Sequence, residues 1–173
     1  MSIKKIVAAS CFSLLFAAGI YARTKDTGLK NGSKYIKMIA GYAQGVLPGA
    51  PGMKPRREYK FILVWESKET PATFYWRGDN GLMDCRMLIV HGYKQAKEGQ
   101  RMEDGEYITE NITNSPLKKG DTLEITPVAG GKFPIPQEIP ADAKNTLFFK
   151  TVKSTWLSFA VKSIQTKPDV VMP

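Results

Sequence analysis

The stretch from Glu58 to Glu66 constrains the fold more than any other part of the chain. In an extended chain, alternate side chains lie on one face of the strand. Here the residues that share one face are large and mostly aromatic: Tyr59, Phe61, Leu63 and Trp65. Ile62 and Val64 lie on the opposite face, so both faces need cover. The sequence therefore predicts a central strand around which a β fold assembles.

Seven further segments are predicted to be strands because they are rich in β-branched, aromatic or alternating apolar residues. They are residues 34–44, 73–76, 85–93, 106–113, 122–128, 146–152 and 155–164. In 106–113, Ile108 and Ile112 are predicted to face inward. No amphipathic helix is predicted after residue 22. The pattern favours an all-β fold, a single antiparallel β-sandwich of about eight strands, with a small closed β-barrel as the alternative.

The first 22 residues have the order of a secretory signal peptide, which precedes the β domain as a helix. Lys4 and Lys5 give a positive start, residues 6–18 form an apolar run, and Ala22 supplies a small residue at a cleavage point. The apolar run is shorter than the ~20 residues of a membrane-spanning helix. We therefore expect an exported protein, periplasmic or associated with the cell surface, with no transmembrane span in its mature form.

Cys11 offers a competing interpretation, because residues 8–11 resemble the small-residue run that precedes a lipid-modified cysteine. The strongest apolar part, residues 12–18, comes after Cys11 and not before it. A lipid anchor at Cys11 is therefore not expected.

The chain divides into four parts: a signal peptide (1–22), a flexible lead-in (23–33), a β-sandwich domain (34–166) and a C-terminal tail (167–173). Cleavage removes two lysines and no acid, so the formal charge falls from +9 to +7. It also removes one of the two cysteines, and Cys85 alone cannot form an internal disulfide. Cys85 is predicted to be a buried apolar filler.

Groups of residues that would carry out catalysis or bind a metal are sparse. His91 and Cys85 lie in one predicted strand, ~20 Å apart at ~3.3 Å per residue, which is too far for a nucleophile–base pair. No metal or cofactor is predicted. Carboxylates gather around turns (Glu66, Glu69, Asp79, Asp84), so a carboxylate-based hydrolase stays open as an alternative.

Basic residues before the central strand suggest a surface for anionic partners. Lys54, Arg56 and Arg57 lie close together in a chain of net positive charge. Nucleic acid is not expected for an exported protein. Anionic glycans, lipid headgroups or an acidic envelope protein are the partners that this charge favours.

Four aromatic residues raise a second possibility, a carbohydrate-binding module or adhesin-like domain. They are Tyr42, Tyr75, Trp76 and Tyr93. Sugar stacking requires flat rings that are exposed on one face, whereas aromatic residues in strands usually pack in the core. Tyr75 and Trp76 are the candidate ligand-binding residues of this set.

Two short motifs have simple structural interpretations. Arg77-Gly78-Asp79 resembles an integrin-binding tripeptide, but residues 78–81 are good turn formers and predict a hairpin tip. Asp121-Thr122-Leu123 resembles an acceptor site for O-linked glycans in exported bacterial proteins.

Three features together give the chain a family likeness. The signal peptide is followed by an early strand that runs into a Gly/Pro loop (43–52), and Lys119-Gly120-Asp121-Thr122-Leu123 precedes a closing pair of aromatic-rich strands. In these features the chain resembles small exported β-sandwich proteins of unknown function from Gram-negative bacteria. The resemblance implies no activity, and the expected function is a non-enzymatic binding or accessory protein of the bacterial cell envelope.

The signal-peptide interpretation predicts that the mature protein begins at Arg23. Mass spectrometry and N-terminal sequencing of the protein from an envelope fraction should show the loss of residues 1–22. A product that retains Met1–Ala22, or one that carries a lipid on Cys11, would contradict this expectation.

Overall fold

A computed structural model describes residues 28–49, 52, 54–94, 107–113, 115–130 and 133–171 of the chain. The predicted signal peptide and Cys11 lie outside these residues. The described part is all-β: it contains ten strands and no helix. The strands are β1 (Lys30–Asn31), β2 (Ile36–Leu47), β3 (Arg56–Trp65), β4 (Pro71–Gly78), β5 (Gly81–His91), β6 (Ile108–Asn111), β7 (Thr122–Pro127), β8 (Thr146–Thr151), β9 (Leu157–Ala160) and β10 (Gln165–Val171).

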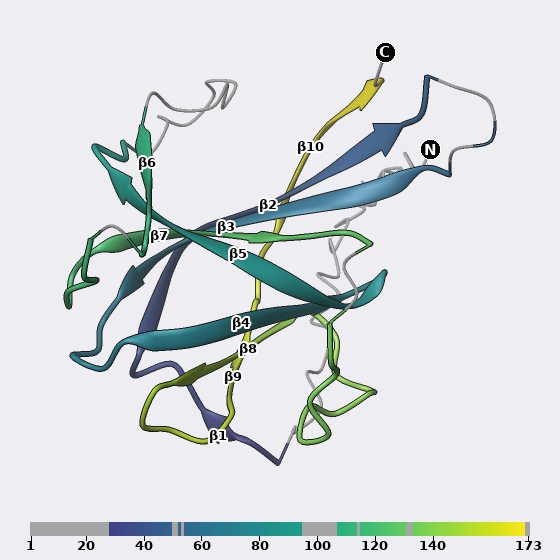
Figure 1. The fold of residues 1–173 in the computed structure, drawn as a ribbon. Coiled ribbons are helices and arrows are strands. Elements are labelled where there is room, and N and C mark those ends of the chain that lie inside the picture. The colour runs from purple at the N-terminus through teal and green to yellow at the C-terminus, as the bar shows by residue number, and fades with distance from the viewer. Residues whose placement is uncertain are drawn as a thin grey trace, which may run out of the picture.

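The strands form one hydrogen-bonded sheet that curls into a half-barrel (Figure 1). The order is β1-β9-β8-β4-β5-β7-β3-β2-β10, and β6 pairs with β5 beside this path. Most neighbours are antiparallel, but the strands at both ends of the path are parallel to their partners, β1 to β9 and β10 to β2. Among the described strands, β1 and β10 do not pair with each other, so the sheet stays open.

The predicted two-sheet sandwich is not confirmed, because β5 belongs to both halves of the curled sheet. Its first residues pair with β4, from Gly78 opposite Gly81 to Tyr75 opposite Asp84. From Cys85 onward, β5 pairs with β7 instead. This long strand (teal in Figure 1) keeps the halves in one ladder, so the all-β prediction holds and the separation into two sheets does not.

The prediction of a central strand is confirmed. β3 is hydrogen-bonded to β2 on one side and to β7 on the other. Its inward side chains lie in the main core, where Phe61, Leu63 and Trp65 are completely buried. On the opposite face, Ile62 packs with Ala40 and Tyr42 in a second cluster. Cover on both faces is what the continuous apolar run of this strand requires.

A third cluster covers the outer face of the β4–β8 part of the sheet. Residues of the loop between β7 and β8 fold back over that face and bury Tyr75, Phe148 and Trp156 together with Ile139 and Ala143. The rings of Tyr75, Phe148 and Trp156 therefore lie under the loop. Cys85 is buried in the main core, as predicted for an apolar filler.

The structure corrects the predictions from sequence in three places. Lys30–Asn31, in the predicted lead-in, forms β1, and residues 167–171, in the predicted tail, belong to β10. β10 was missed because it contains Pro168 and few apolar residues, which an edge strand tolerates. Ile108 is 74% exposed and does not face inward.

The packing of β3 can be tested by truncating Phe61, the one phenylalanine of this strand, which is completely buried. Phe61→Ala should lower the free energy of unfolding by about 3–5 kcal/mol, because it removes a completely buried ring and leaves a cavity. Urea denaturation measures the change. Val152→Ala, at a side chain that is 74% exposed, is the control and should alter stability by less than ~0.5 kcal/mol. Equal effects of the two changes would contradict the described core.

Candidate functional site

A groove of about 520 Å³ crosses the surface of β10, β2, β3, β5 and β7. The charged side chains that line it are five cations and one carboxylate: Arg56, Arg57, Lys60, Arg86, Lys167 and Glu58. We call this set the basic groove. Five positive charges against one negative charge leave a net charge of +4. A concentration of one sign of charge in a hollow raises the local concentration of ligands of the opposite sign.

Strand register brings these residues together from distant parts of the sequence. Lys60 of β3 lies opposite Tyr42 of β2, and Glu58 lies opposite Gln44. On the other side of Gln44, β10 places Lys167 in register. Arg86 is the one Lys or Arg residue of β5 and pairs with Thr126 of β7. The groove is therefore a property of the assembled sheet and not of one loop.

Local contacts orient several of the cations. The Arg56 guanidinium donates to Glu58 Oε1 at 2.8 Å, and Arg57 donates to Thr166 Oγ1 at 3.3 Å. Lys167 Nζ lies 5.1 Å from the centre of the Tyr42 ring, within cation–π range. Such contacts lower the entropy that a cation loses when it binds a ligand.

A buried carboxylate lies beside the groove and fixes Lys60. Glu124 is 5% exposed. It accepts hydrogen bonds from the Tyr107 hydroxyl at 2.6 Å and from Thr126 Oγ1 at 3.0 Å, and Lys60 Nζ is 3.7 Å away. Lys60 also donates to Tyr107 Oη at 3.2 Å. Because a buried charge needs partners, Glu124 has a structural reason to hold Lys60 and Tyr107 at this position.

Tyrosine hydroxyls around the groove resist ionisation. Burial raises the pKa of Tyr42, and the nearby Tyr93 hydroxyl raises it further. Burial also raises the pKa of Tyr59, as does the negative charge of Asp79. The pKa of Tyr107 is raised first by burial and then by its hydrogen bond to Glu124. These tyrosines are therefore neutral hydrogen-bonding groups at physiological pH.

Of the candidate residues from the sequence, Arg56 and Arg57 line the basic groove, whereas Lys54 does not. Lys54 is exposed in the segment that leads into β3. The sequence did not single out Lys60, Arg86 or Lys167 for this surface. Alternation within β3 places Arg56, Glu58 and Lys60 on one face and could have identified Lys60. Lys167 could not be identified from sequence, because residues 165–171 lack the apolar alternation that predicts a strand and contain Pro168.

The other candidates, Tyr75 and Trp76, are buried at 8% and 0% exposure. Tyr42 is also buried, at 7%, and Tyr93 is half-buried. None of the three buried rings offers a free face for sugar stacking. The Nε1 group of Trp76 is buried and has no hydrogen-bond partner among the described residues, which sets it in the core rather than at a surface.

One cluster on β5 and β6 contains the residue types of a catalytic triad in the wrong order. His91 Nε2 lies 3.1 Å from Glu110 Oε2, and Ser115 donates to Glu110 Oε1 at 2.6 Å. The carboxylate is in the middle, whereas activation of a serine requires the histidine between the serine and the carboxylate. Cys85 is buried, whereas His91 of the same strand is exposed, and burial raises the pKa of the Cys85 thiol.

Two further sequence features take ordinary structural roles. Arg77 and Gly78 end β4, and Asp79 and Asn80 form the turn to β5, so the tripeptide lies at the predicted hairpin tip. Asp121 Oδ2 accepts a hydrogen bond from the backbone of Lys118 at 2.7 Å and closes the turn before β7.

Within the described ranges, no group of three or more His, Cys, Asp or Glu side chains is placed to hold a metal ion. No described segment forms a helix with the length and hydrophobicity needed to cross a bilayer.

Comparisons with known proteins identify no family for the chain. No protein-family model, no curated protein and no solved structure matches it. The basic groove therefore has to be interpreted from its own geometry.

Tyrosine ionisation predicts a loss of stability at high pH. The folded-state pKa of Tyr59 lies above its unfolded value of ~10. The protonated Tyr59 hydroxyl therefore contributes its full stability below pH ~10, and this contribution is lost as the pH rises through the folded-state pKa. Urea midpoints measured from pH 8 to 11.5 should fall. The Tyr59→Phe variant, which has no hydroxyl to ionise, should fall less steeply. Parallel curves for the two proteins would contradict the raised pKa.

Proposed function

We propose that the protein is an exported, non-enzymatic binding protein of the bacterial cell envelope that holds an anionic ligand in the basic groove. One observation supports this most strongly: five Lys and Arg side chains and a single Glu line one hollow. Export rests on the sequence of residues 1–22. Within the anionic class, the ligand we propose is a glycan with repeated negative charges, and lipid headgroups or an acidic protein surface are the competing sources.

The arrangement of the cations favours a ligand with several charges. They come from three strands, with Arg56, Arg57 and Lys60 on β3, Arg86 on β5 and Lys167 on β10. A ligand with a single charge would contact only part of this set. A polyanion gains from several contacts at once, because each bound cation replaces mobile counterions.

Binding without catalysis is supported by the state of the carboxylates at this surface. Glu124 is buried and already accepts from Tyr107 and Thr126. Glu58 is engaged by the Arg56 guanidinium. A general acid or base needs access to the substrate, and a pair of carboxylates is needed for glycoside hydrolysis. The carboxylates here are better explained as groups that position cations.

The test is binding of dextran sulfate to the purified protein, with neutral dextran as the ligand control. Arg86→Gln and Lys167→Gln should each weaken binding by about fivefold, since a screened charge contact is worth about 1 kcal/mol. Binding should also weaken as the salt concentration rises. Isothermal calorimetry or a retention assay measures both effects.

Lys153→Gln is the matched control, because Lys153 is an exposed cation outside the basic groove. It should leave the affinity unchanged. Equal binding of neutral dextran, or a loss with Lys153→Gln as large as that with Arg86→Gln, would reject the basic groove as the site. Vesicles that contain anionic lipid, used beside dextran sulfate, separate a headgroup from a glycan.

A further inference from the structure

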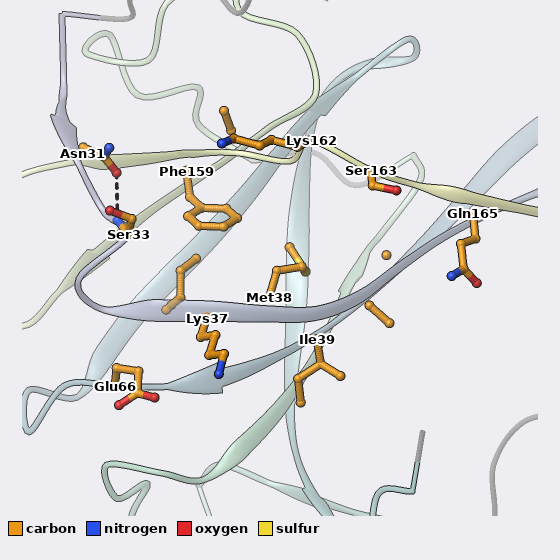
Figure 2. Close-up of a pocket in the computed structure, with 14 residues that line it drawn as sticks. Asn31, Ser33, Lys37, Met38, Ile39, Glu66, Phe159, Lys162, Ser163 and Gln165 are labelled. Atoms are coloured by element: carbon orange, nitrogen blue, oxygen red, sulfur yellow. Dashed lines mark hydrogen bonds between the residues drawn. The ribbon is translucent and has the colours of Figure 1, made fainter. Parts of the chain in front are cut away.

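A second hollow lies where the half-barrel stays open, between the first half of β2 and the segment from β9 to the start of β10. Its volume is about 820 Å³. We call it the β2–β9 slot. It is lined by residues Ile36–Gly41 of β2, by Phe159, Ala160, Lys162, Ser163 and Gln165, and by the polar residues Asn31, Ser33 and Glu66. Figure 2 shows Met38 and Phe159 pointing toward each other across this slot, one from each wall.

Both walls of the slot present strand edges that lack a neighbour among the described strands. β2 pairs with β3 along one edge, but on its other edge β10 begins only opposite Tyr42, so Ile36–Gly41 have no ladder partner there. β9 pairs with β8, and β1 covers its other edge only at Leu157 and Ser158. The edge at Phe159 and Ala160 is therefore also open.

The same edge of β2 already accepts a strand from its own chain. β10 lies parallel to it from Tyr42 to Leu47, although β10 is polar and contains Pro168. Backbone hydrogen bonds, rather than side-chain packing, must supply much of this attachment. The open residues Ile36–Gly41 continue the same edge beyond the start of β10.

The slot is closed at both ends, which limits the length of an occupant. At one end, in the turn that leads to β2, the backbone of Gly32 donates to the Ser158 carbonyl oxygen of β9 at 2.7 Å. In the same turn, the backbone of Ser33 donates to Asn31 Oδ1 at 2.8 Å (dashed in Figure 2). At the other end, Gly41 lies so close to the β9–β10 connection that a Cβ there would be 3.2 Å from the Ser163 carbonyl oxygen. The open edge between these ends is six residues long, or ~20 Å of strand.

The lining favours an occupant that has both apolar side chains and a backbone. Met38 and Phe159 are partly buried and pack at the margin of the main core. A hydrocarbon chain could contact them, but it would remove water from the open N–H and C=O groups of both walls without replacing their hydrogen bonds. Each hydrogen bond lost in this way is unfavourable, because the buried donor or acceptor is left without a partner. An extended peptide satisfies these groups and places every second side chain against Met38 and Phe159.

A second copy of this chain is less well suited than a short segment. The register of β2 shifts between Met38 and Ala40, a β-bulge that bends this edge. Bulges protect sheet edges against continuous pairing with the long edge of another sheet. The bulge lies within Ile36–Gly41, so it divides the open edge into short runs of pairing, which a short segment can make and the continuous edge of another sheet cannot.

We propose that the β2–β9 slot binds a short extended peptide segment of another protein, apolar at every second residue, as an added strand between β2 and β9. This site is separate from the basic groove, and neither proposal depends on the other.

The test pans a phage-displayed library of random octapeptides against the purified protein and then measures the best synthetic peptide by fluorescence anisotropy. Enriched sequences should carry apolar residues at alternate positions. Met38→Lys should weaken binding at least tenfold, because it places a charge in the slot. Val152→Lys, which adds the same charge at an exposed apolar position outside the slot, should leave the affinity unchanged.

A backbone control separates strand addition from apolar contact alone. The same peptide with N-methyl groups on alternate residues keeps its side chains and loses donors, so it should bind at least tenfold more weakly. Circular dichroism and thermal unfolding show whether Met38→Lys folds. If it does not fold, Phe159→Ser replaces it with the same expected loss.

Four outcomes would overturn the proposal. They are no enrichment of alternating sequences, equal binding of the N-methylated peptide, unchanged binding by the folded slot variants, and a stable dimer whose formation buries the slot. If N-methylation does not weaken the peptide and sodium dodecanoate displaces it, the slot binds apolar chains rather than an added strand.

Discussion

The contact between Phe61 and Trp76 is the interaction on which the rest of the structure depends. Phe61 belongs to β3 and Trp76 to β4, which lie in different halves of the curled sheet, and their ring centres are 4.5 Å apart. Both side chains are completely buried. Tyr59 extends this contact, with its ring 5.3 Å from Trp76. Aromatic pairs at these separations bury large areas and hold the concave faces of the two halves together.

This core determines where the candidate binding surfaces can lie. Since Tyr59 and Phe61 face the core, the alternate residues of β3, Glu58 and Lys60, face away from it. On that face, Arg86 of β5 and Lys167 of β10 add their charges to the basic groove. On the other half of the sheet, the β7–β8 loop covers the outer face over Tyr75 and Phe148. The two outer faces therefore differ: one is sealed by apolar contacts, and the other is open and basic.

The sequence predicted the strands whose composition reflects their own packing. Residues 58–66 and 85–93 are nearly continuous apolar runs, and both correspond to inner strands, β3 and β5. It could not predict that β5 would change partners at Cys85, because period-two alternation is the same whether the neighbouring strand is β4 or β7. The difference between a sandwich and one curled sheet lies in that change of partner.

The candidate site was predictable only where its residues are close in sequence. Arg56 and Arg57 stand out as a local basic cluster, whereas Lys167 joins them through a parallel pairing that no local pattern announces. Pro168 argues against a strand in sequence, yet in the structure its carbonyl oxygen accepts a hydrogen bond from Gln44 Nε2 at 2.8 Å. A carbonyl can accept even where proline has no N–H to donate, and an edge strand needs only one bonded side.

β10 connects the two hollows and gives each a different physical character. Lys167 contributes charge to the basic groove, and Gln165, at the start of the strand, lines the β2–β9 slot. Where β10 pairs with β2, the backbone edge is satisfied and only side chains remain to bind a ligand, so charge dominates there. Before β10 begins, the edge itself is open and apolar residues flank it, so hydrogen bonding and burial dominate. Ionic strength acts strongly on the first kind of contact and weakly on the second, because salt screens exposed charges far more than backbone hydrogen bonds.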